Sequence, residues 1–140
     1  MNEDKIFLDT NIIVYGYDIS AGEKHSVAKA ILMDLWNSGS GVLSSQVLQE
    51  FFVSVTRKIP KPLGVKEARR IVADFLKWEI VFLNGEKILE AIDLHAKHRF
   101  SFWDSMILSA AVSGDARILY SEDLVDGFKL DGLTVKNPFA

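Results

Sequence analysis

Short apolar runs alternate along the chain with longer segments in which apolar residues recur at helical spacing. The short runs are apolar at successive positions, which is typical of strands buried on both faces. They predict strands at Lys5–Leu8, Gly41–Ser44, Ile80–Leu83 and Arg117–Tyr120, and a brief one at Leu133–Val135. Such strands belong in the middle of a sheet that is covered on both sides.

The longer segments have the period of amphipathic helices. They predict helices at Val27–Trp36, Val47–Val55, Ala68–Leu76, Ile88–Arg99 and Trp103–Ala111. The expected boundary residues are the N-caps Ser26 and Ser45, the helix-ending Pro60 and Pro62, and the closing Gly114. Strands that alternate with helices imply parallel crossovers. We therefore predict an α/β fold in which residues 1–140 form a single three-layer α/β/α sandwich with a mainly parallel central sheet.

The composition narrows the chemistry. Hydrophobic residues make up 49% of the 140 residues, charged residues make up 25%, and cysteine is absent. The balance is globular, and the lack of cysteine excludes disulfides, zinc–thiolate sites and a thiol nucleophile. The charged N-terminus does not resemble a secretory signal, and no apolar stretch is long enough to span a bilayer. We therefore expect a cytoplasmic protein that makes no membrane contact.

The acidic residues of interest occupy positions where α/β proteins form their sites. Asp9 follows the first predicted strand and Asp123 follows the fourth. The carboxyl ends of parallel strands meet at one edge of a sheet, where ligands bind. Asp104 and Glu50 each lie early in a predicted helix, on the flank of its apolar face. From there a side chain can reach a cleft at the boundary between layers.

Carboxylates gathered in one site repel each other, and each is driven toward protonation unless a cation is present. Mg²⁺ or Mn²⁺ resolves the conflict because both ions prefer oxygen ligands. Such an ion can ionise a bound water, polarise a phosphoryl oxygen and neutralise a leaving oxygen. The acids therefore point to metal-dependent cleavage of phosphodiester bonds.

Segments around these acids carry a resemblance to a known family. They are Ile6–Asn11 (IFLDTN), Ser45–Phe51 (SQVLQEF), Phe102–Ile107 (FWDSMI) and Leu119–Leu124 (LYSEDL). In order and spacing they are similar to the acidic motifs of PIN-domain ribonucleases, and most similar to VapC-type toxins of toxin–antitoxin systems. The resemblance implies a metal-dependent endoribonuclease that acts as the toxin of such a pair. It also implies an RNA substrate, a small antitoxin partner and a homodimer.

The resemblance also assigns roles by position. The family's catalytic and metal-binding acids are matched by Asp9, Glu50, Asp104 and Asp123. It implies that the three aspartates hold Mg²⁺ or Mn²⁺ directly and that Glu50 completes the acidic set. The supporting polar residues, which would hold ligands or water by hydrogen bonds, are matched by Asn11 and Ser121.

Each acid also has an ordinary structural explanation. Asp9 can cap the turn after its strand, Glu50 can be a solvated helix residue, and Asp104 can interact with a helix dipole. After the fourth strand either Glu122 or Asp123 can be the ligand, because strand alternation does not decide between them. The resemblance favours Asp123 and leaves Glu122 to solvent.

Other residues are weaker candidates. The best candidates for contact with the RNA backbone are the basic residues around the proline loop, Arg57, Lys58, Lys61, Lys66, Arg69 and Arg70. No histidine falls at a predicted strand end, so we do not expect histidine catalysis. The large aromatic residues are expected mostly in the core, not as base-stacking platforms: Trp36, Phe51, Phe52, Trp78 and Trp103.

Two other classes of function fit part of this pattern. A haloacid-dehalogenase-like phosphatase also places an aspartate after a strand but needs a second one two residues later, where this chain has Asn11. A receiver domain needs paired acids and a late lysine that the pattern does not show. A catalytically silent PIN-like module that acts through a protein partner is the non-enzymatic alternative. Retention of the whole acidic set favours the enzyme.

Overall fold

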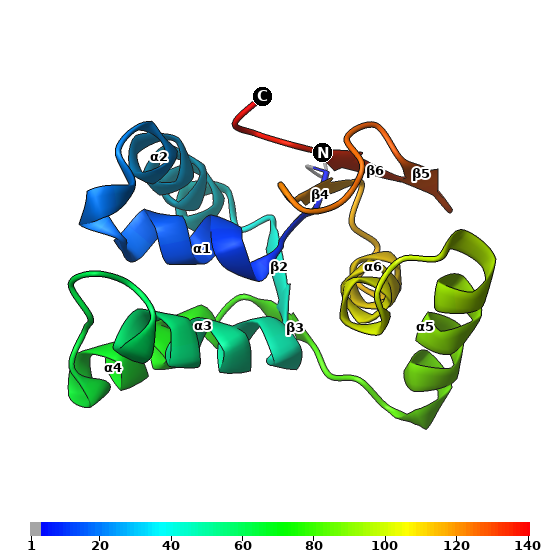
Figure 1. The fold of residues 1–140 in the computed structure, drawn as a ribbon, viewed down its shortest axis with the longest axis horizontal. Helices are drawn as coiled ribbons and strands as arrows, with labels where there is room; N and C mark the ends of the chain where they lie inside the picture. The colour runs from blue at the N-terminus through cyan, green and yellow to red at the C-terminus, as the bar shows by residue number, and fades with distance from the viewer. Residues whose placement is uncertain (1–3) are drawn as a thin grey trace.

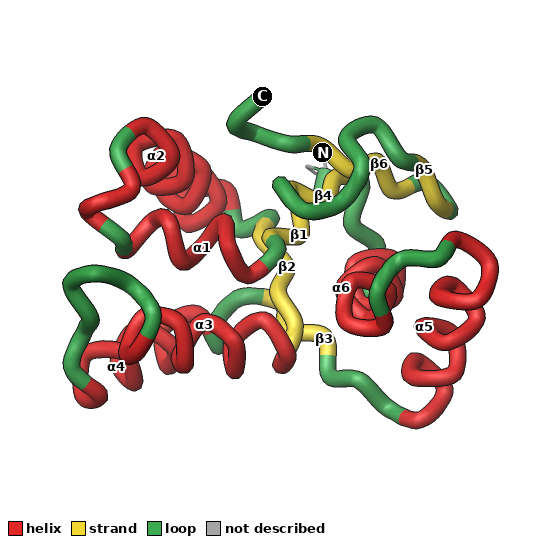
Figure 2. Tube along the Cα trace, in the orientation of Figure 1, coloured by secondary structure: helices red, strands yellow, loops and turns green. Residues whose placement is uncertain are grey.

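A mixed sheet runs through the middle of the molecule in this computed structural model, which describes residues 4–140 (Figure 2). The strand order is β3-β2-β1-β4-β6-β5. The strands are β1 (Ile6–Leu8), β2 (Gly41–Ser44), β3 (Glu79–Val81), β4 (Ile118–Tyr120), β5 (Lys129–Leu130) and β6 (Leu133–Lys136). Neighbouring strands are parallel except for β5 and β6. The mainly parallel sheet predicted from the alternation of elements is confirmed.

Helices cover both faces of this sheet. They are α1 (Thr10–Tyr17), α2 (Glu23–Ser38), α3 (Ser45–Arg57), α4 (Val65–Phe75), α5 (Gly85–His98) and α6 (Phe102–Ser113), with a 3₁₀ turn at Ile19–Ala21. Figure 1 shows α1 to α4 on one side of the strands and α5 and α6 on the other. The predicted three-layer α/β/α sandwich is therefore confirmed. No helix within residues 4–140 combines the length and apolar composition needed to cross a membrane.

The core is continuous through all three layers. Its largest fully buried side chains include Phe7 and Leu8 of β1, Phe51 of α3, Phe75 of α4 and Leu108 of α6. Each such side chain contributes about 1.5–3 kcal/mol through the area it removes from water. Because β1 lies inside the sheet and is packed on both faces, the residue that directly follows it is held in a well-defined position.

Helix α1 is the main element that the hydrophobic pattern did not reveal. Its sequence, TNIIVYGY, is rich in β-branched and aromatic residues and contains a glycine, all of which disfavour a helix. It forms because Asp9 caps its first turn and because Ile12 and Ile13 are fully buried, with α2 and α3 as its neighbours. Tertiary burial here outweighs local propensity.

Strand β5 was also missed, because it is only two residues long. It pairs with β6 through a two-residue turn in which Asp131 and Gly132 both have positive φ, 48° and 85°. An Asp-Gly pair suits such a turn, because aspartate and glycine tolerate the left-handed region better than other residues. Asp131 and Gly132 therefore close the β5–β6 hairpin.

Several predicted boundaries were wrong by a few residues. Helix α2 begins at Glu23 with Gly22 as its N-cap, not at Val27 with Ser26 as its N-cap. Helix α3 is capped by Ser44, not Ser45, because the Ser44 hydroxyl accepts a hydrogen bond from the Val47 amide at 3.2 Å. Strand β3 ends at Val81, where its partner strand β2 ends. The following residue, Phe82, was predicted in the strand and is instead 67% exposed.

Gly41, the first residue of β2, marks a close approach between a strand and an aromatic ring. A methyl group added there would lie 2.4 Å from a carbon of the Trp78 ring. That ring is itself restrained by edge contacts with Trp36 and Phe75, whose ring centres are each 5.1 Å away. The absence of a side chain at this position is therefore a packing requirement.

Replacing Gly41 by alanine should lower the free energy of unfolding by about 1–3 kcal/mol, because the tryptophan must leave its place to admit the methyl group. Gly85→Ala is the matched control, since nothing lies within 4 Å of the added methyl group. Gly85→Ala should change stability by less than about 1 kcal/mol. Urea unfolding of both variants measures the difference, and equal stability of the two would contradict this account.

Candidate active site

The ends of two adjacent parallel strands bring residues 112 positions apart into contact. Asp9 directly follows β1, and Ser121 directly follows β4. The Asp9 amide donates a hydrogen bond to the Tyr120 carbonyl at 3.0 Å, which extends the ladder between the two strands. The Ser121 hydroxyl donates to Asp9 Oδ2 at 2.8 Å. The expectation that Asp9 and the segment after β4 meet at the carboxyl edge is therefore confirmed.

Asp9 is buried and serves as the N-cap of α1. Its exposed fraction is 8%, and both carboxylate oxygens are occupied. Oδ1 accepts from the Thr10 amide at 2.7 Å, and Oδ2 accepts from the Ser121 hydroxyl. The capping role considered for Asp9 from the sequence thus exists, and it coexists with a position at the rim of a shared cavity.

Ser121 and Asn11 orient the second aspartate. The fully buried Ser121 hydroxyl accepts hydrogen bonds from the amides of Asp123 and Leu124, at 3.2 and 3.3 Å, and so shapes the turn after β4. The Asn11 side-chain amide donates to Asp123 Oδ2 at 3.2 Å. Both residues therefore contact an acid of the candidate set, as their expected supporting role requires.

The other two acids come from α3 and α6. Glu50 Oε1 accepts a hydrogen bond from the Thr10 hydroxyl at 2.6 Å, which ties α3 to the start of α1. Asp104 stands in the first turn of α6, whose N-cap Ser101 accepts from the Asp104 amide at 3.1 Å. Because Ser101 provides the cap, the Asp104 carboxylate is left for other contacts.

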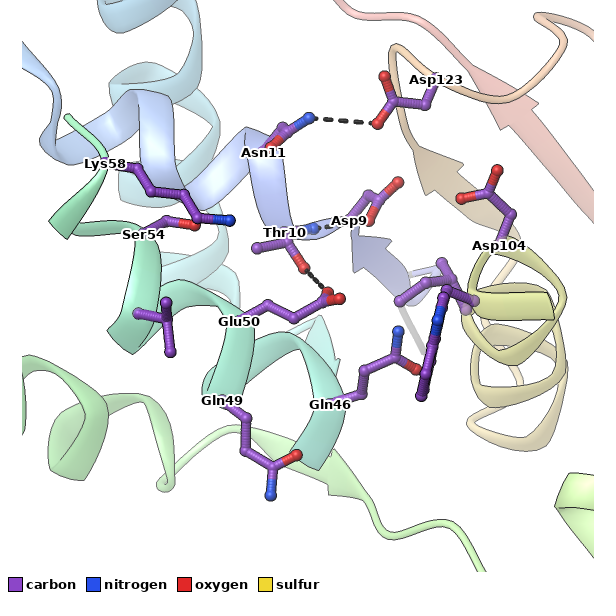
Figure 3. Close-up of a pocket in the computed structure, with 13 residues that line it drawn as sticks. Asp9, Thr10, Asn11, Gln46, Gln49, Glu50, Ser54, Lys58, Asp104 and Asp123 are labelled. Carbon is purple, nitrogen blue, oxygen red and sulfur yellow. Dashed lines mark hydrogen bonds between the residues drawn. The ribbon is translucent and has the colours of Figure 1, made fainter. Parts of the chain in front are cut away.

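All four candidate acids line one cavity of about 430 Å³. Figure 3 shows Asp9 at its centre, Asp104 and Asp123 on one side, and Glu50 on the other, beside Thr10. The rest of the lining is formed by Thr10, Asn11, Gln46, Gln49, Val53, Ser54, Lys58, Trp103 and Ile107. Carboxylates from four separate elements therefore face a common space.

The electrostatics of the cavity are those of crowded like charges. Burial raises the pKa of Asp9 to about 6, against the opposing effect of its hydrogen bonds from Ser121 and Thr10, and the charges of Asp123 and Asp104 raise it further. Burial also raises the pKa of Asp123, with Glu122 and Asp104 acting in the same direction. The cavity therefore favours a cation.

The donor atoms of the cavity match a metal ion in chemical kind but not yet in arrangement. Among the described residues, no group of three or more His, Asp or Glu side chains is arranged so that it could already hold an ion. In chemical kind the set fits a hard divalent cation, because its donors are carboxylate oxygens and the charges of Asp104 and Asp123 act on buried Asp9. The carboxylates thus surround a shared space without forming a closed coordination shell.

Glu122 does not lie in solvent as expected. Its side chain is 16% exposed and turns away from the cavity, toward α1 and α2. The Tyr15 hydroxyl donates to Oε1, and Lys24 Nζ lies 2.8 Å from Oε2. The two adjacent acids after β4 therefore face opposite ways: Glu122 anchors the turn to the helices, and Asp123 faces the cavity.

Trp103 was also placed wrongly by the sequence, which predicted a core residue. It is 61% exposed and lines the cavity next to Asp104. The core prediction also fails for Trp36, which is 40% exposed, whereas it is correct for Phe51. A helical period marks which residues share a face, but near a helix end it does not show whether another layer covers that face.

The cavity also contains residues that the sequence analysis did not single out, notably Thr10, Gln46 and Ser54. A signal existed for Gln46, because it precedes Glu50 by one helical turn and so shares its face. Of the basic stretch, Lys58 is the member that lines this cavity. The lining contains none of the histidines, all of which belong to the described part of the chain.

Comparisons with known proteins agree with this arrangement. The family model of the PIN domain matches residues 6–126. A toxin–antitoxin complex from Klebsiella pneumoniae has a chain with TM-score 0.70 and 18% identity, over 96% of this chain and 98% of that one. The Sarcin-Ricin loop cleaving toxin VapC20 of Mycobacterium tuberculosis gives a TM-score of 0.64 and 19% identity, over 84% and 88% of the two chains.

A DNA-bound VapBC complex from Salmonella typhimurium gives a TM-score of 0.66 at 16% identity, over 97% of this chain and 99% of that one. At such identities the likeness to solved structures shows the fold. No curated protein sequence matches the chain significantly.

The raised pKa of Asp9 predicts an unusual dependence of stability on pH. The ordinary pKa of an aspartate is 3.8, and the pKa of Asp9 in the fold is about 6. Between these two pH values the folded chain therefore holds a proton that the unfolded chain releases. The associated stability is fully present below about pH 4 and is lost as pH rises through 6. Two pKa units correspond to about 3 kcal/mol.

Urea unfolding in EDTA, from pH 4 to pH 7.5, measures this loss against the Asp9→Asn variant, which cannot titrate at this position. The difference in unfolding free energy between the two proteins should shift by about 3 kcal/mol across the range, in favour of the variant at high pH. Parallel pH profiles of the two proteins would mean that Asp9 titrates normally.

Proposed function

Because the chain belongs to the PIN-domain family, we propose that it is a divalent-metal-dependent endoribonuclease and the toxin of a toxin–antitoxin pair. The observation that carries the proposal is the cavity that Asp9, Glu50, Asp104 and Asp123 line together. A neighbouring fold described as a Sarcin-Ricin loop cleaving toxin, and others described as toxin–antitoxin complexes, support the toxin part of the proposal.

The acids would hold Mg²⁺ or Mn²⁺, with Asp9, Asp104 and Asp123 as direct ligands and Glu50 completing the set. When bound, the ion supplies an activated water and neutralises charge on the phosphodiester oxygens. Burial and the charges of Asp123 and Asp104 raise the pKa of Asp9, and a bound cation would offset both effects. Oxygen donors alone do not distinguish Mg²⁺ from Mn²⁺.

The chain's own residues prepare this chemistry. Thr10 and Ser121 occupy both oxygens of Asp9 and so fix the orientation of its carboxylate. Asn11 holds Asp123 through its side-chain amide. The Thr10 hydroxyl bonds one oxygen of Glu50, and the other oxygen has no hydrogen-bond partner within residues 4–140, so it is available to orient an attacking water. Asn11 and Ser121 are therefore supporting residues in the proposal and not ligands.

We further propose that residues 1–140 act as one nuclease domain in the cytoplasm, on RNA. Lys58 provides a positive charge in a cavity whose other charged lining residues are acids, and no carboxylate among residues 4–140 pairs with it. A phosphate of the RNA backbone is a suitable partner for such a lysine. An RNA substrate would thus be held by Lys58 and the metal against the repulsion of the acids.

Cleavage should depend on the acids and on added metal. Asp104→Asn is the sharpest variant, because the Asp104 carboxylate has no hydrogen bond in the described structure and the fold does not need it. Removing a direct ligand should lower cleavage of total RNA by more than about 100-fold, while Ser121→Ala, which removes only support, should cost about 10- to 100-fold.

Asp34→Asn, on an exposed position of α2 away from the cavity, is the control and should cleave normally. Chelation by EDTA should abolish activity, and Mn²⁺ or Mg²⁺ should restore it. A wild-type protein without metal-dependent cleavage would favour the catalytically silent binding module. Expression of the wild type, and not of Asp104→Asn, should arrest growth if the protein is a toxin.

Two exposed apolar surfaces support the proposed protein partners, a second copy and an antitoxin. One is a groove of about 510 Å³ between α3, α4 and the segment after β3, whose apolar lining is Leu48, Phe52, Val53, Val72, Leu76 and Phe82. The other is a stripe on α5 formed by Ile88, Leu89 and Ile92, exposed by 39%, 63% and 45%. Exposed apolar surfaces of this kind mark interaction sites.

We expect the purified chain to have the mass of a dimer in light scattering. Leu89→Ser and Leu76→Ser each remove an apolar side chain from one of the two surfaces, and one of them should yield a monomer. Asp34→Asn is the control and should remain dimeric. The antitoxin is tested by a pull-down from cell extract with the Asp104→Asn protein immobilised. A small protein captured in this way should restore growth when it is expressed together with the wild-type chain. A monomeric wild type would contradict the homodimer.

A further inference from the structure

Two side chains of the cavity play no part in holding the carboxylates. Trp103 is 61% exposed, and Gln46 is only 8% exposed. Both line the cavity that the acids line. Neither forms a hydrogen bond with Asp9, Glu50, Asp104 or Asp123 in the described residues, so the proposed metal chemistry leaves them unexplained.

Gln46 carries a buried polar atom without a partner. Its Oε1 has no hydrogen bond within residues 4–140. A buried acceptor left unpaired costs about 1–3 kcal/mol, so its presence in a cavity wall calls for a donor that comes from outside the fold. Gln46 lies one turn before Glu50, and Figure 3 shows both side chains projecting from α3 into the cavity. The Gln46 amide therefore lies in the cavity wall, with its nitrogen turned toward the acids and the unpaired Oε1 covered by its surroundings.

Trp103 differs from the other two tryptophans of the chain. Trp36 and Trp78 pack against Phe75 and each other, with ring centres 5.1 to 5.5 Å apart. Within the described part of the chain, Trp103 has one aromatic contact, an edge contact with its neighbour Phe102 at 5.2 Å. A large, exposed indole beside Asp104 is a surface on which a planar group can stack.

The charge of the cavity limits what that planar group can be. The lining contains four acids and one base, Lys58, which Figure 3 shows across the cavity from Asp104. A second phosphate next to Trp103 would be repelled by Asp104, whereas a nucleobase is neutral. A base also has a face that stacks on an indole, and its edge carries acceptors for the Gln46 side-chain N–H and donors for Oε1 once the amide turns.

We propose that Trp103 and Gln46 form a nucleobase subsite, which stacks and hydrogen-bonds one unpaired base of an RNA strand beside the carboxylates. The proposal rests on the proposed nuclease function and specifies which residues of the cavity contact a base. A base inside a duplex is stacked and paired on both sides and cannot reach the indole or the amide.

The experiment measures kcat and KM on a short single-stranded RNA, and the affinity of labelled oligonucleotides for the cleavage-deficient Asp104→Asn protein. Trp103→Ala should raise KM and weaken binding by about 5- to 100-fold, which corresponds to the loss of one stacked base. Trp103→Phe should retain most of the affinity because it keeps an aromatic face. Met33→Ala, which removes a 57% exposed apolar side chain of α2 outside the cavity and outside both apolar surfaces, should leave KM unchanged.

Gln46→Leu separates a binding role from a structural one. It removes an unpaired buried acceptor, so its melting temperature should stay the same or rise, while its KM should increase. A series of single-stranded oligonucleotides, each with one abasic position, should contain one position whose missing base weakens binding to the Asp104→Asn protein and has little effect once Trp103→Ala is added. A duplex of the same sequence should bind weakly to both proteins.

Several outcomes would overturn the subsite. Unchanged KM and affinity in Trp103→Ala, with an active wild type, would reject it and leave the nuclease proposal standing. The same holds if no abasic position affects binding, or if Gln46→Leu melts earlier with normal KM. If Trp103→Ala loses a captured antitoxin but not RNA, the indole belongs to a protein interface. A wild type that neither binds nor cleaves RNA would reject both proposals.

Discussion

The hydrogen bonds of the buried Asp9 carboxylate join the start of α1, the ends of β1 and β4, and the acidic cavity. One oxygen is bonded to the first amide of α1 and the other to the hydroxyl of Ser121 at the end of β4. This single side chain therefore starts a helix, joins the ends of two parallel strands and stands at the centre of the acidic cavity. It can do so because β1 and β4 are adjacent and in register up to Leu8 and Tyr120, immediately before Asp9 and Ser121.

Keeping these acids close together lowers the stability of the fold. A carboxylate that is 8% exposed, and near two other acids, is held in its charged form at a cost, which its pKa of about 6 expresses. The large apolar core around Phe7, Leu8 and Phe51 supplies the stability that allows such a site to exist. Each supporting hydrogen bond, from Thr10, Asn11 and Ser121, limits how far the acids can move apart. The fold thus keeps its negative charges together when no cation is present.

The proposed metal ligands and the residues proposed to contact substrate are different side chains of the cavity. The acids come from the ends of β1 and β4 and from α3 and α6, whereas Trp103, Gln46 and Lys58 stand around them on α6 and at the two ends of α3. A change at Trp103 or Gln46 would alter what binds without removing a proposed ligand. Helix α3 contributes both Glu50 and Gln46 because residues one turn apart share a face, so the proposed chemistry and the proposed recognition are coupled through one rigid element.

The sequence by itself determined the layered α/β fold and the identity of the candidate acids. Buried strands and amphipathic helices have distinct local periods, and Asp9 and Asp123 follow strands whose ends must meet in a parallel sheet. Helix α1 could not be predicted, because TNIIVYGY disfavours a helix locally and forms one only through the cap by Asp9 and burial between α2 and α3. The opposite directions of Glu122 and Asp123 also depended on distant partners, Tyr15, Lys24 and Asn11. Exposure was likewise decided by tertiary structure. Trp103 fits an apolar helical period, but no other layer covers it, and Gln46 Oε1 is buried without a hydrogen-bond partner in residues 4–140 because α3 packs where it does. Local sequence sets which residues share a face, and only the packing of layers sets which faces are covered.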